Sequence, residues 1–310
     1  MTPRPETAHH APVFATRAAT LVSPCPGQII LETNLGDGGH TAEFLTREPT
    51  IRILAFELDP DAIARAAHYL GPERFRQVTV FQTSFANLES SLAPLGLMGT
   101  IDGALVDPGL SLKQATVGEY GFSFMADGPL KMTFDPEAHP NAADVLATLD
   151  AGELASLFGA ADVPSKQAHL VAEAVVSTRH RAPLETTTEF RELIVRTLGH
   201  AKEGKRHVAT RYFMALRMAV NHELADLDVM LPQLLKSLKV GGVGVLLSYH
   251  GGESKLMREF LKTYKHAPKS PRTDDLRLEV IAGPESPSRE EIRRNPAARS
   301  ALLRAFRRGA

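Results

Sequence analysis

Short apolar runs alternate with helical patterns through the first third of the chain. The runs QIILET, IRILAFELD, VTVFQTSF and IDGALVDPG have the length of buried strands and are rich in residues that favour strands. Segments with helical spacing lie between them, and one starts at Pro60, a residue suited to the first turn of a helix. This alternation predicts an α/β fold with a mostly parallel, doubly wound sheet.

The next strand-like run, GVGVLLSYH, lies around Val243, more than a hundred residues after the fourth. The residues between have helical spacing and no strand alternation, so we expect a helical insertion there. We place a Rossmann-like domain at residues 1–112 and 210–310 and the insert at 113–209. One long helix from Thr210, a candidate N-cap, is expected to return to the sheet, and a helix (SKLMREFLKTY) and a strand (LRLEVIAG) close it.

Composition narrows the class of protein. Of the 310 residues, 43% are hydrophobic and 23% are charged, which is typical of a globular protein, and the longest apolar runs are too short to cross a membrane. Cys25 is the single cysteine, which excludes internal disulfides and cysteine-based zinc sites and favours a reducing compartment. The first residues lack the apolar stretch of a secretory signal.

Although the net charge is only −1, the chain contains two basic tracts. The first lies at KEGKRHVATRYFMALR and the second in the tail, EIRRNPAARSALLRAFRRGA. Clustered basic side chains suit contact with a polyanion such as RNA, and a solvated charged face is the alternative. We expect these side chains to contact RNA phosphates: Lys205, Arg206, Arg211, Arg217, Arg299 and Arg304.

The stretch LETNLGDGGHT joins the first strand to a helix through a glycine-bearing turn. Gly36, Gly38 and Gly39 permit close approach to backbone N–H groups at the start of a helix, which suits an anionic or polar ligand. Glu57 follows the second strand, 21 residues after Gly36, the spacing of an acidic residue that binds ribose hydroxyls. An adenosine-containing cofactor is therefore expected; a simple tight turn and a solvated strand end are the alternative.

Asp107 and Pro108 follow the fourth strand. In methyltransferases that act on amino groups, an acidic or amide residue before proline at this edge holds the reacting nitrogen. A carboxylate there can accept hydrogen bonds from the amine, align the nitrogen with a sulfonium methyl group and take or relay its proton. A turn that merely begins with Asp-Pro is the alternative.

Together these residues resemble the RsmH, or MraW, family, whose members use S-adenosylmethionine to methylate N4 of a cytidine in small-subunit ribosomal RNA. The resemblance covers essentially the whole chain, and its most specific stretches are GFSFMADGPLKM, HVATRYFMALRMAVNHEL, LSYHGGESKLM and NPAARSALLR. It implies a class I methyltransferase domain with a helical RNA-recognition insert between the fourth and fifth strands.

The resemblance also implies roles for single residues. Asp107 and His250 are the expected catalytic residues, and no metal site is expected. Tyr249 and Phe124 are candidates to stack a flipped cytosine, although Phe124 suits the core better. The expected contacts of S-adenosylmethionine are Gly36, Gly38, Gly39, His40, Glu57, Phe85, Asp107 and Gln114.

Several positions depart from the family's pattern. Thr33 replaces a glycine, Lys131 an aspartate and Tyr249 a phenylalanine, and Lys113 also lies in an altered stretch. These changes motivate an alternative, an inactive methyltransferase-fold factor for small-subunit assembly; a nicotinamide-dependent oxidoreductase is a weaker one.

The resemblance bears on partners and location as well. The expected partners are small-subunit ribosomal RNA or its precursor particle, other assembly factors and a second copy in a homodimer, with no membrane. The departures favour the mitochondrial matrix, with the bacterial cytoplasm as the other location.

Overall fold

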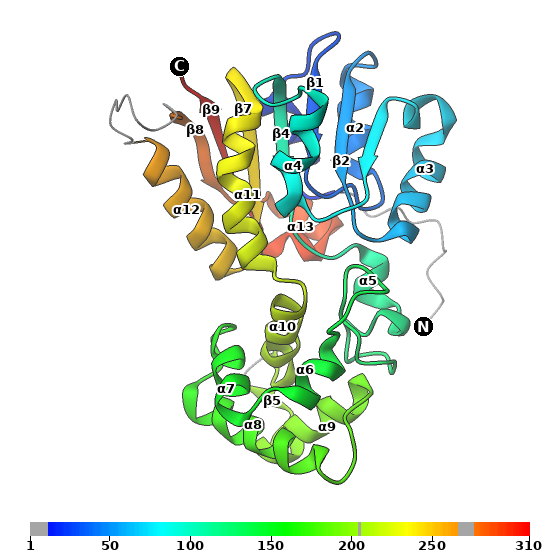
Figure 1. Cartoon of the computed structure of the whole chain (residues 1–310), viewed down its shortest axis with the longest axis vertical. Helices are drawn as coiled ribbons and strands as arrows, with labels where there is room; N and C mark the ends of the chain where they lie inside the picture. Colours follow the sequence, from blue (N-terminus) through cyan, green and yellow to red (C-terminus); the bar gives the residue numbers. More distant parts are fainter. Residues whose placement is uncertain (1–11, 204–205, 266–275) are drawn as a thin grey trace. The chain divides into compact units, whose positions relative to one another are not determined.

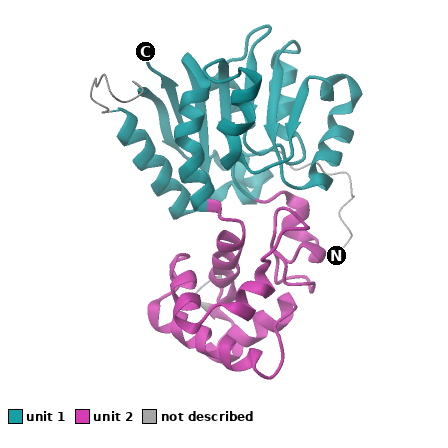
Figure 2. Cartoon of the chain, in the orientation of Figure 1, with its two compact units in different colours: residues 1–109, 224–310 teal, residues 110–223 magenta. Residues whose placement is uncertain are grey.

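The computed structural model describes residues 12–203, 206–265 and 276–310. The chain forms two compact units. Unit 1 comprises residues 1–109 and 224–310, and unit 2 comprises residues 110–223 (Figure 2). We describe each unit by itself.

Unit 1 contains a seven-stranded sheet (Figure 1). The strand order is β3-β2-β1-β4-β7-β9-β8, in which the first five strands are parallel and β9 is antiparallel to both neighbours. This arrangement confirms the predicted doubly wound, Rossmann-like sheet with its interruption between the fourth and fifth strands. The strands are β1 (Ile29–Glu32), β2 (Arg52–Phe56), β3 (Val78–Phe81), β4 (Ile101–Val106), β7 (Leu238–Ser248), β8 (Leu278–Glu285) and β9 (Leu302–Arg308).

Successive residues of each central strand enter different hydrophobic clusters, because side chains alternate between the faces of a sheet. Ile30 joins a cluster with α1 and α2, whereas Leu31 joins one with α4, α11 and α12. Both faces of the sheet are therefore covered by helices, as a parallel sheet requires. The helices of this unit are α1 (Ala15–Val22), α2 (Gly39–Arg47), α3 (Pro60–Phe75), η1 (Phe85–Asn87), α4 (Leu88–Leu92), η2 (Ala93–Leu95), α11 (Glu223–Ser237), α12 (Gly251–Lys265), α13 (Arg289–Arg294) and η4 (Pro296–Ser300).

The C-terminal tail forms strand β9, which the sequence analysis missed. Its sequence, LLRAFRR, pairs with β7 on one side and β8 on the other. Leu303, Ala305 and Phe306 are buried because this strand lies inside the sheet. The arginines of this segment predict a charged surface, but the apolar residues between them form part of the core.

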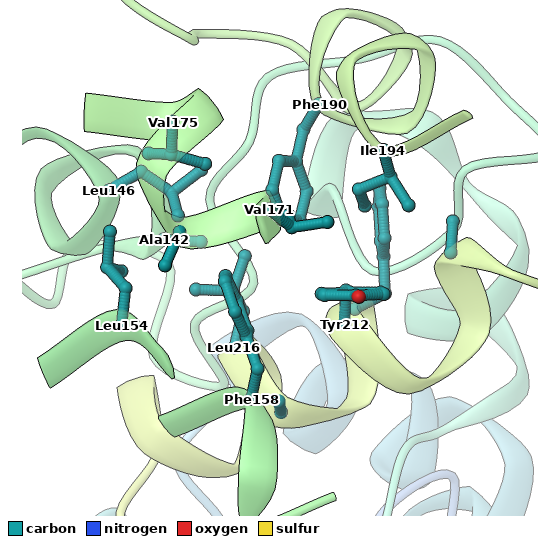
Figure 3. Close-up of a cluster of buried hydrophobic side chains, with 14 of the residues drawn as sticks. Ala142, Leu146, Leu154, Phe158, Val171, Val175, Phe190, Ile194, Tyr212 and Leu216 are labelled. Atoms are coloured by element: carbon teal, nitrogen blue, oxygen red, sulfur yellow. The ribbon is translucent and has the colours of Figure 1, made fainter. Parts of the chain in front are cut away.

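Unit 2 is mostly helical, as predicted for the insert. Its helices surround a hydrophobic core that includes Phe158, Phe190 and Tyr212 (Figure 3). Side-chain capping boxes begin four of them, at Ser111, Asn141, Asp150 and Thr186. Its elements are α5 (Leu112–Thr116), η3 (Gly118–Tyr120), α6 (Ala142–Thr148), α7 (Ala151–Gly159), α8 (Ser165–Arg179), α9 (Thr187–Leu198), β5 (Lys202–Glu203), β6 (Arg206–His207) and α10 (Ala209–Val220).

The expected long helix after Thr210 is in fact two helices, α10 and α11. The chain turns between them at His222, whose φ of 50° lies in the left-handed region. The N-cap of α10 is Val208 rather than Thr210. Tyr212 and Leu216 place α10 in the core of unit 2, so the compact units divide at 109/110 and 223/224, whereas we expected 112/113 and 209/210.

Within the described ranges, no helix has both the length and the apolar composition that crossing a membrane requires.

Candidate active site

The glycine turn after β1 is built from left-handed backbone. Gly36 has a φ of 52° and Gly38 a φ of 81°, and both conformations favour glycine. A Cβ atom at Gly38 would lie 3.2 Å from the Cβ of Ala66, so this glycine allows α3 to pack closely. A Cβ at Gly36 would meet nothing within 4 Å, so here the backbone borders open space. The turn therefore leaves Gly36 open to an approaching ligand.

Glu57 braces this turn from the end of β2. Its Oε2 accepts a hydrogen bond from the Gly36 N–H at 2.8 Å, and its Oε1 accepts from Leu58 and Asp59 at 2.8 and 3.0 Å. Burial raises the pKa of Glu57, although these three backbone donors act in the opposite direction. A carboxylate has about four acceptor positions, so one remains for a ligand hydroxyl. The spacing between Gly36 and Glu57 predicts that Glu57 belongs to the site, but it does not predict the hydrogen bonds that Glu57 accepts from the backbone of the turn.

Glu32, the last residue of β1, is a charged group that the sequence analysis did not single out. It is 1% exposed, and Thr41 Oγ1 donates to its Oε1 at 2.9 Å. Its Oε2 is buried without a hydrogen-bond partner among the described residues. Burial raises the pKa of Glu32 to about 7, against the opposing effect of His40. An unpaired buried carboxylate oxygen suits a cationic ligand group. In the sequence, the position of Glu32 as an acidic residue just before the glycine turn was the feature that could have identified it.

Asp107 meets two partners just after β4. Tyr249 Oη donates a hydrogen bond to Asp107 Oδ1 at 2.6 Å, and His40 Nε2 lies 3.2 Å from Asp107 Oδ2. Burial lowers the pKa of His40, but the carboxylates of Asp107, Glu32 and Glu43 outweigh it, so the net shift is upward. The structure therefore joins the glycine turn, β4 and β7 around one carboxylate.

His250 lies at the end of β7 and contacts Glu253. The His250 Nε2 atom lies 3.2 Å from Glu253 Oε1, and the backbone N–H groups of Tyr249 and His250 donate to Glu253 Oε2 at 2.6 and 3.2 Å. Glu253, at the start of α12, is 1% exposed. These contacts fix the end of β7, and a catalytic role of His250 stays a prediction.

The other predicted site residues lie in different surroundings. Phe85 opens η1 after β3 and packs in part against the core of unit 1. Gln114 belongs to unit 2, where its Oε1 accepts from Ser111 N in the capping box of α5; its cofactor contact stays a prediction. Phe124 packs edge-on against Phe213 with ring centroids 5.0 Å apart, which confirms its expected core role.

One predicted RNA contact is wrong. Arg304 is 8% exposed, and its guanidinium donates to Ser254 Oγ at 2.9 Å and Ser248 Oγ at 3.4 Å. It lies on β9, inside the sheet, so it cannot reach an RNA phosphate. Burial lowers the pKa of Arg304.

The remaining basic candidates fall into three groups. Arg217 forms a bidentate pair with Glu223, with N–O distances of 2.7 and 2.8 Å, and Arg211 donates to the carbonyl of Asp162 at 2.8 Å. Arg299 is exposed on η4. Lys205 and the side chain of Arg206 lie outside the described residues.

Comparison with known proteins adds independent evidence. The model of the MraW methylase family matches residues 7–309. The chain is 34% identical to Ribosomal RNA small subunit methyltransferase H of Coprothermobacter proteolyticus, over 97% of this chain and 96% of that protein. It is 36% identical to the protein of the same name from Thioalkalivibrio sulfidiphilus, over 99% of each. A putative methyltransferase from Streptococcus mutans, solved in complex with SAH, aligns over 99% of each chain at 10% identity with a TM-score of 0.44. The family match and the two full-length relatives establish that this chain belongs to the MraW methylase family.

Proposed function

We propose that this protein transfers a methyl group from S-adenosylmethionine to N4 of a cytidine in small-subunit ribosomal RNA. The observation that carries the proposal is the Asp107 carboxylate, held by Tyr249 and His40 at the carboxyl end of β4. Ligands of doubly wound sheets bind at this edge. The relatives of the same family are named as methyltransferases of small-subunit ribosomal RNA.

The residues around the glycine turn fit S-adenosylmethionine. Gly36 borders open space, and Glu57 retains an acceptor position for a ribose hydroxyl. The unpaired Oε2 of Glu32 suits the ammonium group of the methionine part. When bound, the cofactor supplies an electrophilic methyl group on a positively charged sulfur. These three residues bind and orient it.

Asp107 has two tasks in the proposed reaction. Its carboxylate accepts a hydrogen bond from the exocyclic amine of cytidine, which aligns the nitrogen for an in-line attack. The bound cofactor would supply the methyl group, and the methylated amine would carry a positive charge until a base removes one of its protons. Asp107 accepts or relays that proton, since it lies within reach of the amine it holds.

The alternative of an inactive assembly factor rested on altered positions. Thr33 is accommodated: it is 1% exposed, its N–H donates to Leu105 at 3.1 Å and its hydroxyl to Asn34 at 2.8 Å. The carboxylates that the chemistry needs, Glu57 and Asp107, are both present and hydrogen-bonded. These observations favour the enzyme. A precursor particle as the substrate, partner assembly factors, a homodimer and a mitochondrial location stay predictions.

The proposal is tested by separating cofactor binding from catalysis. Asp107→Ala should retain most of the affinity for S-adenosylmethionine in calorimetric titration and lose methyl transfer to small-subunit RNA by at least about 100-fold. Glu73→Gln is the matched control, because Glu73 pairs with Arg76 on the surface of α3, and it should leave both quantities unchanged. Transfer by Asp107→Ala at the wild-type rate would refute the proposed role.

A further inference from the structure

Tyr249 contacts the carboxylate on which the proposed chemistry depends. Its hydroxyl donates to Asp107 Oδ1 at 2.6 Å, while His40 lies 3.2 Å from Asp107 Oδ2. The strand order places β4 between β1 and β7, so the two contacts reach Asp107 from opposite sides. The Tyr249 hydroxyl occupies one of the two acceptor positions of Oδ1, and His40 lies at ion-pair distance from Oδ2.

We infer that Tyr249 is a positioning residue that, together with His40, fixes the plane of the Asp107 carboxylate so that its free acceptor positions face the cytidine amine. This inference rests on the proposed function. Without a donor on Oδ1, the carboxylate can rotate about its Cβ–Cγ bond. A small misalignment of this kind lowers the rate strongly, because the nitrogen must be in line with the methyl group.

The hydroxyl of Tyr249 is a permanent donor. Burial and, next, the Asp107 charge raise the pKa of Tyr249 well above its usual range, so the hydroxyl keeps its proton at physiological pH. An ionised carboxylate can only accept hydrogen bonds, so the donor is Tyr249. Tyr249 is therefore the donor in this contact whenever Asp107 is ionised.

The position of Tyr249 is itself fixed. Its backbone N–H donates to the buried Glu253 at 2.6 Å, and its ring packs against the hydrophobic cluster beneath the sheet. The backbone N–H and the hydroxyl of Tyr249 both donate hydrogen bonds, so its ring is poorly suited to rotate outward and stack on a base. Stacking on a base was the role that the sequence suggested. The hydrogen bond to Asp107 accounts for this side chain better.

The hydroxyl is also a departure from the pattern that the sequence analysis identified, in which phenylalanine occupies this position. Tyr249→Phe therefore removes a single oxygen atom and keeps a ring that suits the site. Tyr264→Phe is the matched control, because it removes the same atom from a ring that packs against Phe260 on α12.

We would measure methyl transfer by both variants with S-adenosylmethionine and small-subunit RNA each varied to saturation. Tyr249→Phe should lower kcat about 10-fold. Its KM for RNA and its Kd for the cofactor should stay within about 2-fold of wild type, and Tyr264→Phe should match wild type throughout. An unchanged kcat would overturn the inference, and so would an effect confined to KM, because that would assign Tyr249 to RNA binding.

A second measurement separates this inference from the proposed function. If the wild-type protein transfers no methyl group to cytidine, the proposed function fails, and crystal structures then test the positioning. We expect a single orientation of the Asp107 carboxylate in wild type. In Tyr249→Phe we expect either a rotated carboxylate or two alternative orientations. The same orientation in both proteins would overturn the inference.

Discussion

His40 Nε2 lies 3.2 Å from Asp107 Oδ2, so the glycine turn after β1 and the acidic end of β4 meet in one site. The two residues stand far apart in the sequence and are joined by the order of the strands. The contact is between a side chain assigned to the cofactor and one assigned to the reacting amine.

The ion pair of His40 predicts a pH-dependent contribution to stability. The folded-state pKa of His40 lies above its usual value, because nearby carboxylates outweigh burial. The charged form is therefore favoured in the folded state, which stabilises the protein below the unfolded pKa and is lost as pH rises through the folded pKa. Chemical denaturation of wild type and His40→Gln should show a wild-type advantage that shrinks with increasing pH. An advantage that grows with pH would contradict the assigned charge.

Glu32 also makes stability fall as pH rises, but here the charged form is the one that the folded state disfavours. Its pKa is about 7 in the folded protein, above its ordinary value of 4.5, so ionisation costs stability as pH rises between these values. Glu32→Gln removes this cost, and without ligand it should be more stable than wild type above about pH 7, by on the order of 3 kcal/mol. The same variant should bind S-adenosylmethionine more weakly, because the amide offers no negative charge. Denaturation at pH 8 and calorimetric titration measure the two effects; a less stable variant at that pH would show that ionised Glu32 is well compensated.

Glu57→Gln should weaken cofactor binding about 10-fold. An amide has one acceptor oxygen, whereas Glu57 uses one oxygen for Gly36 and the other for Leu58 and Asp59. The variant can therefore accept hydrogen bonds either from Gly36 or from Leu58 and Asp59, but not from all three. Titration with S-adenosylmethionine checks this, and equal affinities would remove Glu57 from the cofactor site.

Two arginines of the tail should behave differently. Arg304→Ala leaves the hydroxyls of Ser248 and Ser254 without their buried donor and should lower the free energy of unfolding by about 2 kcal/mol. Arg299→Ala changes an exposed position, so it should leave stability unchanged and weaken RNA binding. It should also reduce the slope of log affinity against log salt concentration by about one. Denaturation and RNA titration at several salt concentrations distinguish the two; similar stability losses in both would place Arg299 in the fold.

Much of unit 1 could be predicted because local pattern and tertiary structure agree there. Pro60 begins α3 as expected, and the spacing of Gly36 and Glu57 corresponds to a direct hydrogen bond. Strand β9 was harder to foresee. Arg304 looked like a surface residue, and its burial depends on β9 entering between β7 and β8.

The contacts within the site could not be predicted from local patterns. Tyr249 and Asp107 come together only because β7 lies beside β4 in the sheet. The unpaired oxygen of Glu32 depends on how the protein buries the end of β1. Such features follow from packing between distant segments, which spacing along the chain does not encode.

The proposed function is tested most directly by identifying the nucleoside that the wild-type protein methylates. Small ribosomal subunits that lack the modification would be incubated with the protein and S-adenosylmethionine carrying a labelled methyl group, and the RNA would be digested and analysed by mass spectrometry. We expect label in N4-methylcytidine with the wild-type protein and no label with Asp107→Ala. Label on another base, or no label despite cofactor binding, would contradict the proposed function.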